Sequence, residues 1–287
     1  MKFANKKIDV LIPVYKPDKS FDTVISRLLN QKIKVNKIII INTVDHKSGE
    51  LKNIWNSDKI LIKNIQKSEF NHGLTRNYGM TLSDADYVMC MTQDAIPADR
   101  HLIDQLIKVF ENEDVIVAYA KQIPRKDCKY VERYTRAFNY PDEDIVKTRD
   151  SIDTMGIKAI FCSDVCAMYD RNKYFEIGGF RKADFNEDML FAYDAITSGK
   201  KVYYASKARV IHSHNYSYRQ QFFRNIEIGK SQKEFQDVFG SLKSENEGIR
   251  MVKNGIKYFI KNKKAYLIPD FILYSGFKFA GFKIGKM

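Results

Sequence analysis

The chain has 287 residues, of which 44% are hydrophobic and 13% aromatic, and its formal net charge at pH 7 is +13. This composition supplies enough apolar side chains for a large core and excludes a mostly disordered chain. No segment reaches the ~18–20 apolar residues that a membrane-spanning helix needs, and residues 1–7 lead into a strand without the apolar region of a signal peptide. The positive charge indicates an anionic partner: nucleic acid, phospholipid head groups or a phosphorylated substrate.

The first 120 residues alternate between buried strands and amphipathic helices. Continuous apolar runs predict strands at residues 8–14, 37–42, 60–65, 87–91 and 115–120. Apolar residues at helical spacing predict helices at residues 21–29, 71–82 and 102–110, with a shorter one at 51–55. Strands that alternate with helices indicate an α/β fold with a Rossmann-like, mostly parallel, doubly wound sheet.

The pattern becomes less regular after Pro124. Residues 125–148 have no firm period, which suits a substrate-facing segment or surface helices. Asn186 opens a helix with an apolar face, and the last predicted strand ends at His212-Ser213-His214. Further strands are predicted at residues 159–169, 201–204 and 209–211.

The cysteines indicate the redox compartment. Cys90, Cys162 and Cys166 lie in apolar sequence, as buried free thiols do, and the four cysteines form no zinc-like pair of pairs. We therefore expect a cytoplasmic protein with reduced thiols.

The positive charge is concentrated in residues 241–287, which contain ten Lys or Arg residues and three acidic ones. Apolar residues within this tail fall on one helical face, at Ile249, Val252, Ile256, Phe259 and Ile260. A basic amphipathic helix of this kind is typical of a membrane interface; the alternative is a helical pair that packs on the domain's own core. We predict a domain at residues 1–240 and a basic tail at 241–287 that holds the protein peripherally on an anionic membrane surface.

Four polar clusters lie at the ends of predicted strands or at the starts of predicted helices. These positions lie at the edge of the sheet where a ligand site would form. Asp94 directly follows a buried strand, at the carboxyl edge where open α/β sheets hold ligands. It is a candidate for handling a metal or phosphate, although it could instead cap the next helix. The other polar clusters are residues 71–79, residues 186–188, and the pair His212 and His214.

The order of these motifs resembles the inverting glycosyltransferases of family 2, which have the GT-A fold, and especially the bacterial rhamnosyltransferases of that family. The likeness covers residues 8–230 and rests on IPVYKP, FNHGLTRNYG at 70–79, TQDAIP at 92–97, FCSDVCAMYDR at 161–171, GGF…NED at 178–188 and HSHNYS at 212–217. The pair FNHG-x-TRN and TQDA-x-P is the most specific part of the resemblance.

The resemblance implies roles for individual residues. Asp188 would be the general base that removes the proton from the acceptor hydroxyl. Asp94 and His214 would hold a Mg²⁺ or Mn²⁺ ion at the donor diphosphate, and Asp164 and Glu187 would lie on the acceptor side or support the site. The residues implied to bind the nucleotide sugar are Pro13, Val14, Tyr15, Asn71, His72, Arg76, Gln93 and Asp94.

The implied reaction is a single displacement with inversion at the anomeric carbon. By resemblance the donor is dTDP-rhamnose, the sugar is L-rhamnose, and the acceptor is a cell-surface glycan carried on a polyprenyl lipid at the inner face of the cell membrane. The alternatives are a family 2 transferase with another donor, such as a UDP-hexose, and a degenerate protein that only binds sugar nucleotides. A nucleic-acid-binding protein or a membrane scaffold is disfavoured, because the basic residues cluster on the tail and the domain keeps TQD and NED.

Two positions depart from the family pattern. Thr92 stands at the first carboxylate of the Asp-x-Asp metal motif, which leaves one firm carboxylate for the cation. Asn42 and Thr43 follow the second strand where an aspartate is usual, with Asp45 nearby. These departures bear on the strength of metal binding and on how the base of the donor is recognised.

Overall fold

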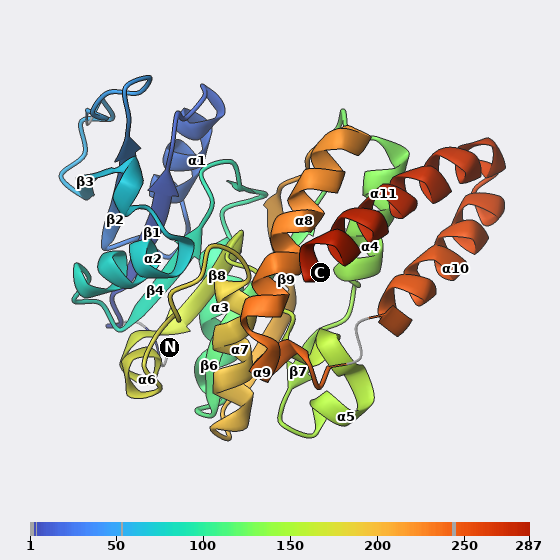
Figure 1. Ribbon diagram of the computed structural model, residues 1–287. Coiled ribbons are helices and arrows are strands. Elements are labelled where there is room, and N and C mark those ends of the chain that lie inside the picture. Colours follow the sequence, from blue (N-terminus) through green and yellow to red (C-terminus); the bar gives the residue numbers. More distant parts are fainter. Residues whose placement is uncertain (1–2, 4, 53, 243–244) are drawn as a thin grey trace.

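The computed structural model describes residues 3, 5–52, 54–242 and 245–287. Its centre is a nine-stranded sheet (Figure 1). The strands are β1 (Ile8–Val14), β2 (Lys37–Val44), β3 (Ile60–Gln66), β4 (Tyr87–Met91), β5 (Ile96–Pro97), β6 (Val115–Ile123), β7 (Ile145–Lys147), β8 (Cys166–Asp170) and β9 (Lys201–Ile211). Their order across the sheet is β3-β2-β1-β4-β8-β6-β9-β5, and β7 also pairs with β9.

Most of the sheet is parallel, as the sequence predicted. β1 pairs in parallel with β2 and β4, β2 pairs in parallel with β3, and β6 pairs in parallel with β9. β8 is inserted antiparallel between β4 and β6. The chain builds β2 and β3 on one side of β1 and then crosses to β4 on the other. This reversal creates a switch point, and ligands of open α/β sheets bind beside the carboxyl ends of such strands.

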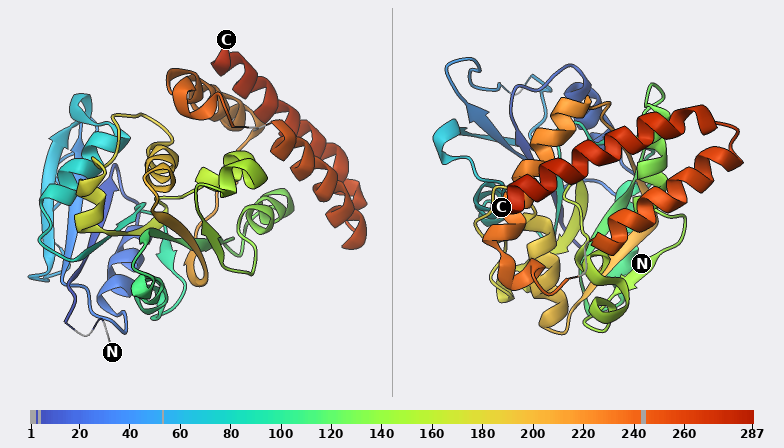
Figure 2. Two further views of the ribbon diagram at one scale, coloured as in Figure 1. Left: turned by 90° about the horizontal axis from the view of Figure 1, so that it is seen from below. Right: turned by 45° about the vertical axis from the view of Figure 1, so that its right-hand side comes forward.

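Helices cover both faces of the sheet (Figures 1 and 2). Alternate residues of β1 point to opposite faces: Val10 and Ile12 pack with α1 (Ser20–Leu29) and α3 (Leu102–Ile107), whereas Leu11 packs with the helices of the other face. The helices on that second face include α2 (His72–Thr81), α6 (Arg171–Glu176) and α7 (Glu187–Thr197). All four cysteines are buried free thiols, which confirms the prediction for three of them.

Six further helices complete the described part of the chain. They are α4 (Tyr130–Asn139), α5 (Ser151–Met155), α8 (Tyr218–Glu234), α9 (Gln236–Phe239), α10 (Glu245–Lys261) and α11 (Ile268–Lys286). Short 3₁₀ turns occur at Lys67–Glu69, Lys108–Glu111, Gly156–Ile160 and Ala265–Leu267.

Three local predictions were wrong. Residues 51–55 form no helix in their described part, which excludes Asn53. The strand expected at 159–169 is β8, which begins only at Cys166 and ends at Asp170, because the start of the expected range belongs to a 3₁₀ helix. The two strands expected at 201–204 and 209–211 are one strand, β9, whose pairing with β6 shifts register between Ala205 and Arg209. The segment after Pro124 contains the helix α4, which is one of the two alternatives that the sequence allowed, although Val131 and Tyr134 of this helix are buried.

The basic tail forms α10 and α11, which lie side by side along one flank of the molecule (Figure 2). α11 packs lengthwise against α8 at backbone contact: a Cβ at Gly281 would lie 2.3 Å from the carbonyl oxygen of Phe222, and one at Gly285 would lie 2.1 Å from that of Ile226. Glycine is therefore required at these two positions of α11. In the described part of the chain, no helix is both long and apolar enough to cross a membrane.

The apolar face predicted for the tail is only partly used for packing. Phe259 is fully buried and forms a small core with Val131 and Tyr134 of α4 and with Phe271 and Tyr274 of α11. Ile249 and Ile260 remain 56% and 58% exposed. The tail therefore packs on the domain through one set of apolar residues and leaves a second set accessible.

Candidate active site

Tyr15 and Gln93 lie at the carboxyl ends of β1 and β4, on either side of the switch point. The Gln93 side chain holds the main chain of Tyr15 from both sides: the Tyr15 N–H donates to Oε1 at 2.7 Å, and Nε2 donates to the Tyr15 carbonyl at 3.1 Å. The Tyr15 hydroxyl donates to Asp45 at 2.6 Å, and this hydrogen bond holds the pKa of Asp45 well below its usual range. The Asp45 carboxylate is thus kept ionised beside the first strand.

A cavity of about 510 Å³ opens beside these strand ends. Residues from every polar cluster of the sequence line it, and these clusters are spread over residues 72–214 of the chain. The predicted site residues among them are His72, Arg76, Asp94, Asp164, Glu187, Asp188 and His214. Pro13, Val14, Tyr15, Asn71 and Gln93 lie outside its lining.

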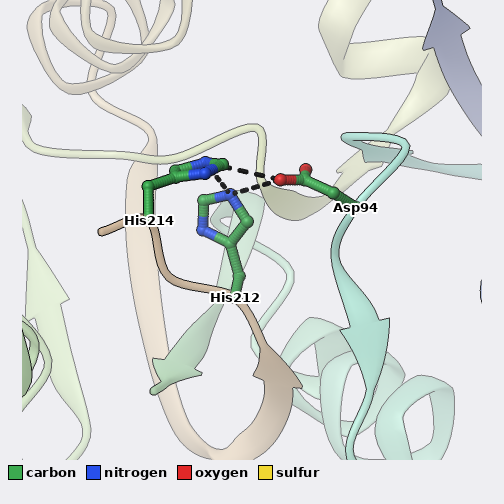
Figure 3. A group of neighbouring side chains, drawn as sticks. All are labelled: Asp94, His212 and His214. Carbon is green, nitrogen blue, oxygen red and sulfur yellow. Dashed lines mark hydrogen bonds and ion pairs between the residues drawn. The ribbon is translucent and has the colours of Figure 1, made fainter. Parts of the chain in front are cut away.

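Asp94, His212 and His214 point toward one another on one wall of this cavity (Figure 3). The Nε2 atoms of both imidazoles lie 3.4 Å from Oδ2 of Asp94, and 3.1 Å from each other. The two histidines follow β9 and Asp94 follows β4, so two separate strand ends build the cluster. Asp94 is not the cap of α3, whose N-cap residue is His101.

Gln122 determines which nitrogen of His212 faces the cluster. Nδ1 of His212 lies 2.9 Å from Oε1 of Gln122, and the same oxygen also accepts from Arg136, which can only donate. Nδ1 must therefore carry a proton, and in the neutral ring Nε2 presents a lone pair to Asp94 and His214.

The chemistry of this donor set fits a divalent cation. Burial lowers the pKa of both imidazoles, that of His214 to about 4, so both rings are neutral at pH 7. Two neutral imidazole nitrogens and a carboxylate oxygen would then point lone pairs at one another with no donor between them. A cation between these three atoms would accept all three lone pairs and remove the repulsion. One carboxylate and two imidazoles are common ligands of divalent metals, and Gln122 orients His212 as carbonyl groups orient metal-binding histidines.

Asp188 lies on another wall of the same cavity, in the first turn of α7. The residue before that helix, Asn186, has a left-handed backbone with φ of 64°, a conformation that costs energy and is often found at functional sites. The Asp188 carboxylate accepts from its neighbour's N–H at Met189 (2.8 Å) and from the N–H of Asp164 (3.1 Å). These bonds fix the carboxylate but leave it lone pairs for a substrate proton.

Arg76 lies between two other carboxylates beside Asp188. Its Nε is 3.0 Å from Asp164, its Nη1 is 3.0 Å from Glu187, and the side chain is only 4% exposed. Desolvation raises the pKa of Asp188 well above its usual range, Glu187 and Asp164 raise it further, and Arg76 opposes them. The Asp188 carboxyl, one of three acidic groups near the Arg76 guanidinium, is therefore more basic than the carboxyl of an ordinary aspartate.

The sequence profile of "Glycosyl transferase family 2" matches residues 9–178 of this chain. The chain belongs to this glycosyltransferase family. A relative at 35% identity, the O-antigen chain rhamnosyltransferase RfbN of Salmonella typhimurium, aligns over 98% of this chain and 90% of its own length. The O-antigen chain rhamnosyltransferase WbaN of Salmonella anatum is 34% identical over 88% of this chain and 80% of its own.

A solved structure shows the same fold at much lower identity. The mannosyltransferase PcManGT of Pyrobaculum calidifontis, solved with GDP-Man and Mn²⁺, superposes with a TM-score of 0.64 at 9% identity. The alignment covers 96% of this chain and 86% of that one. The fold of this family 2 glycosyltransferase is therefore GT-A, as the sequence resemblance implied.

Three residues of the transferase are placed differently from what the sequence led us to expect. The guanidinium of Arg76 is already paired with Asp164 and Glu187 and is not a free fork for a diphosphate. Asn71 caps α2 by accepting from Leu74 N–H and ties that helix to the loop before α7 through Asp184. Gln93 uses both ends of its amide on the main chain of Tyr15.

The sequence reasoning did not assign three residues of the glycosyltransferase's site. His212 was noted only as a neighbour of His214, although two histidines at i and i+2 after a strand can present both rings to one point. Gln122 and Arg136 were not noted, and no local motif marks them: one comes from β6 and the other from α4. Their contribution depends on a contact between segments that only the fold brings together.

Proposed function

We propose that this family 2 enzyme transfers L-rhamnose from dTDP-rhamnose, with inversion, to a cell-surface glycan carried on a lipid. Two relatives that align over most of the chain are named as O-antigen chain rhamnosyltransferases, and this supports the sugar and the acceptor class. The observation that carries the reaction type is that one cavity is lined by both the basic carboxylate Asp188 and the cluster of Asp94, His212 and His214.

Asp188 is the proposed general base. Proton abstraction is efficient when the pKa of the base approaches the working pH, and desolvation with neighbouring carboxylates moves the pKa of Asp188 upward from its usual value. The acceptor hydroxyl would donate to this carboxylate, attack the anomeric carbon and displace the nucleoside diphosphate from the opposite side. Asp164 and Glu187 support this step by setting the charge around Asp188, and Arg76 keeps them paired.

Asp94, His212 and His214 are the proposed ligands of the metal. A cation held there would supply positive charge for the diphosphate that leaves. Mg²⁺ prefers a ligand set made of oxygens alone, and the mannosyltransferase PcManGT was solved with Mn²⁺, so we propose Mn²⁺ over Mg²⁺. With Thr92 at the first position of the Asp-x-Asp motif, the second histidine replaces the missing carboxylate as a ligand.

The nucleotide is proposed to lie beside β1 and β4. Pro13 and Val14 end β1, and Tyr15 is fixed by Gln93 and Asp45, so the backbone there is rigid enough to pair with a base. His72 lines the cavity and is partly exposed, which suits a contact with the donor. Asn71 and Arg76 would act indirectly, by holding the loop and the carboxylates that face the sugar.

The tail, residues 241–287, is proposed to hold the enzyme at the inner face of the cell membrane. Its outward apolar side chains include Ile260, Tyr266 and Leu273, which are 58%, 69% and 50% exposed, and exposed lysines such as Lys257 and Lys261 lie nearby. Each basic residue near an anionic surface contributes about 1 kcal/mol. Sedimentation with anionic vesicles tests this: binding should weaken with salt and be absent with zwitterionic vesicles, and salt-insensitive binding would contradict it.

A donor panel tests the reaction. Purified enzyme with a glycan acceptor should release nucleoside diphosphate from dTDP-rhamnose and not from UDP-hexoses, and EDTA should abolish the release until Mn²⁺ is added. Turnover of a UDP-hexose would identify the other donor class. Donor binding without any turnover across acceptors would show a protein that only binds sugar nucleotides.

A further inference from the structure

An apolar groove of about 810 Å³ runs between the tail and the domain. This volume lies toward the upper end of the ~300–1,000 Å³ that is usual for small-molecule sites. Its walls come from α10, α11, α8 and the end of α4, and include Ile249, Ile272 and Phe279. These three side chains are 56%, 50% and 58% exposed, so the groove presents hydrocarbon to the solvent.

The groove is continuous with the catalytic cavity. Asn139, Asn225 and Lys278 line both of them, so one ligand can lie in the two spaces at once. A molecule whose polar end faces Asp188 can place an apolar part between α10 and α11. Figure 1 shows α11 ending beside α8, and the junction lies where these two helices pack together.

A partly buried cation stands at the junction. Lys278 extends over the ring of Tyr274 at 5.8 Å, and no carboxylate of the described residues lies within ion-pair distance of its ammonium group. Arg136 and Arg224 lie near it, and the nearby Glu132 is already paired with Arg136 at 2.7 Å. Burial lowers the pKa of Lys278, and an anionic ligand would offset this desolvation.

Two buried polar atoms in the groove also lack partners. Among the described residues, Oγ of Ser275 and Oε1 of Gln232 form no hydrogen bond, and the Gln232 side chain is 95% buried, with 5% exposed. Such orphaned atoms are rare in native proteins and call for a ligand or water. Ser275 lies one turn before Lys278 on α11, so the two face the same side. Hydrocarbon alone would leave the Ser275 hydroxyl without an acceptor, whereas a phosphate oxygen can accept its hydrogen bond.

We propose that this groove binds the hydrocarbon chain of the lipid-linked acceptor, with Lys278 and Ser275 holding its phosphate at the junction with the catalytic cavity. The inference rests on the proposed function and adds to it the place where the lipid is recognised. The ligand class is a single long hydrocarbon chain that is joined through a phosphate to the acceptor glycan. Its polar end would extend past Asn139 and Asn225 toward Asp188, and its chain would lie against Ile249, Ile272 and Phe279.

Direct binding of a soluble lipid phosphate tests the proposal without donor or membrane. Fluorescent farnesyl phosphate, used below its micellar concentration, should bind the full-length protein and be displaced by unlabelled farnesyl phosphate. Inorganic phosphate and farnesol should each compete far more weakly, because each offers only half of the ligand. A short-chain phosphatidylglycerol that competes as well as farnesyl phosphate would overturn the assignment to the acceptor and indicate a membrane phospholipid.

Matched variants locate the site. Phe279→Asp and Lys278→Met should each weaken farnesyl phosphate binding by about tenfold or more, since one removes apolar contact and the other the charged hydrogen bond. Leu273→Asp and Lys261→Met, which lie on the same two helices outside the groove, should change it less than about twofold. No binding by the wild type, or an equal loss in all four variants, would overturn the proposal.

The proposed reaction is judged separately. Turnover of dTDP-rhamnose with a short acceptor that lacks a lipid is measured on the wild type. Turnover together with absent farnesyl phosphate binding rejects the lipid groove alone. Farnesyl phosphate binding with no turnover of any donor supports the groove and rejects the proposed reaction.

Discussion

Replacing Arg76 by Met tests the charge arrangement around the general base. The guanidinium is 4% exposed and lies 3.0 Å from both Asp164 and Glu187. Removing it leaves buried carboxylates without their cation, which typically costs about 3–5 kcal/mol of folding stability. With roughly 2–4 °C per kcal/mol for a domain of this class, the melting temperature should fall by about 10 °C at pH 7.5.

The stability lost in the Arg76→Met variant should increase with pH. Burial raises the pKa of Asp164 to about 7, and Arg76 works in the opposite direction, so the variant's carboxyl groups have folded-state pKa values above those of the unfolded chain. Such groups bind protons on folding, and stability is therefore lost as the pH rises. The deficit against wild type should be smaller at pH 5 than at pH 7.5.

Thermal unfolding followed by circular dichroism at both pH values measures this effect. Arg209→Met is the control, because Arg209 also pairs with a carboxylate at 3.0 Å, that of Asp99, but is 51% exposed. An exposed pair contributes about 0–1 kcal/mol, so this variant should melt within a few degrees of wild type at both pH values. An Arg76→Met protein as stable as Arg209→Met would refute the reasoning.

Two further predictions concern the metal and the base. His212→Ala should weaken Mn²⁺ binding, measured by calorimetry, by at least about tenfold. The control His101→Ala changes a half-exposed histidine outside the cluster and should leave Mn²⁺ affinity unchanged. Equal affinities in the two variants would remove His212 from the ligand set. Glu187→Gln should shift the acid limb of the pH–rate profile to lower pH, since the Glu187 charge raises the pKa of Asp188; an unmoved limb would dissociate Glu187 from the base.

Much of the sheet could be predicted because its strands are buried on both faces. Tyr87–Met91 is an unbroken apolar run and Ile8–Val14 is an apolar run with one charge, Asp9; both strands lie where the sequence placed them. β8 was harder to delimit, since the apolar sequence before Cys166 continues into a 3₁₀ turn. Its antiparallel insertion between β4 and β6 depends on long-range pairing that no local pattern encodes.

Helix α4 shows a signal that was present but passed over. Val131, Tyr134 and Phe138 recur at i, i+3 and i+7, yet the charged residues between them obscured the period. These side chains pack against the tail, with Tyr134 5.8 Å from Phe259 and 5.5 Å from Phe271 between ring centroids. The apolar face of the tail therefore had a partner within the domain, which the sequence left open as an alternative.

The site was predictable by residue type and motif order but not by contact. Asp94, His214 and Asp188 line one cavity, as their places after strands and before a helix suggested. The resemblance implied that Arg76 binds the nucleotide sugar. An arginine in the polar first turns of a helix gives no sign that two distant carboxylates will surround it. Arg76 instead pairs with Asp164 and Glu187, which are close to it only in the folded chain, so the sequence alone could not show these ion pairs.

The most direct test of the central claim is the rate of sugar transfer by Asp188→Asn. Nucleoside diphosphate release with donor and acceptor should fall by ~10²- to 10⁴-fold, while donor affinity measured by calorimetry with Mn²⁺ stays close to wild type, because the base acts on the acceptor hydroxyl. Asp142→Asn, at a carboxylate whose side chain is 98% exposed, should retain full activity. An Asp188→Asn enzyme with more than half of the wild-type rate would contradict the account.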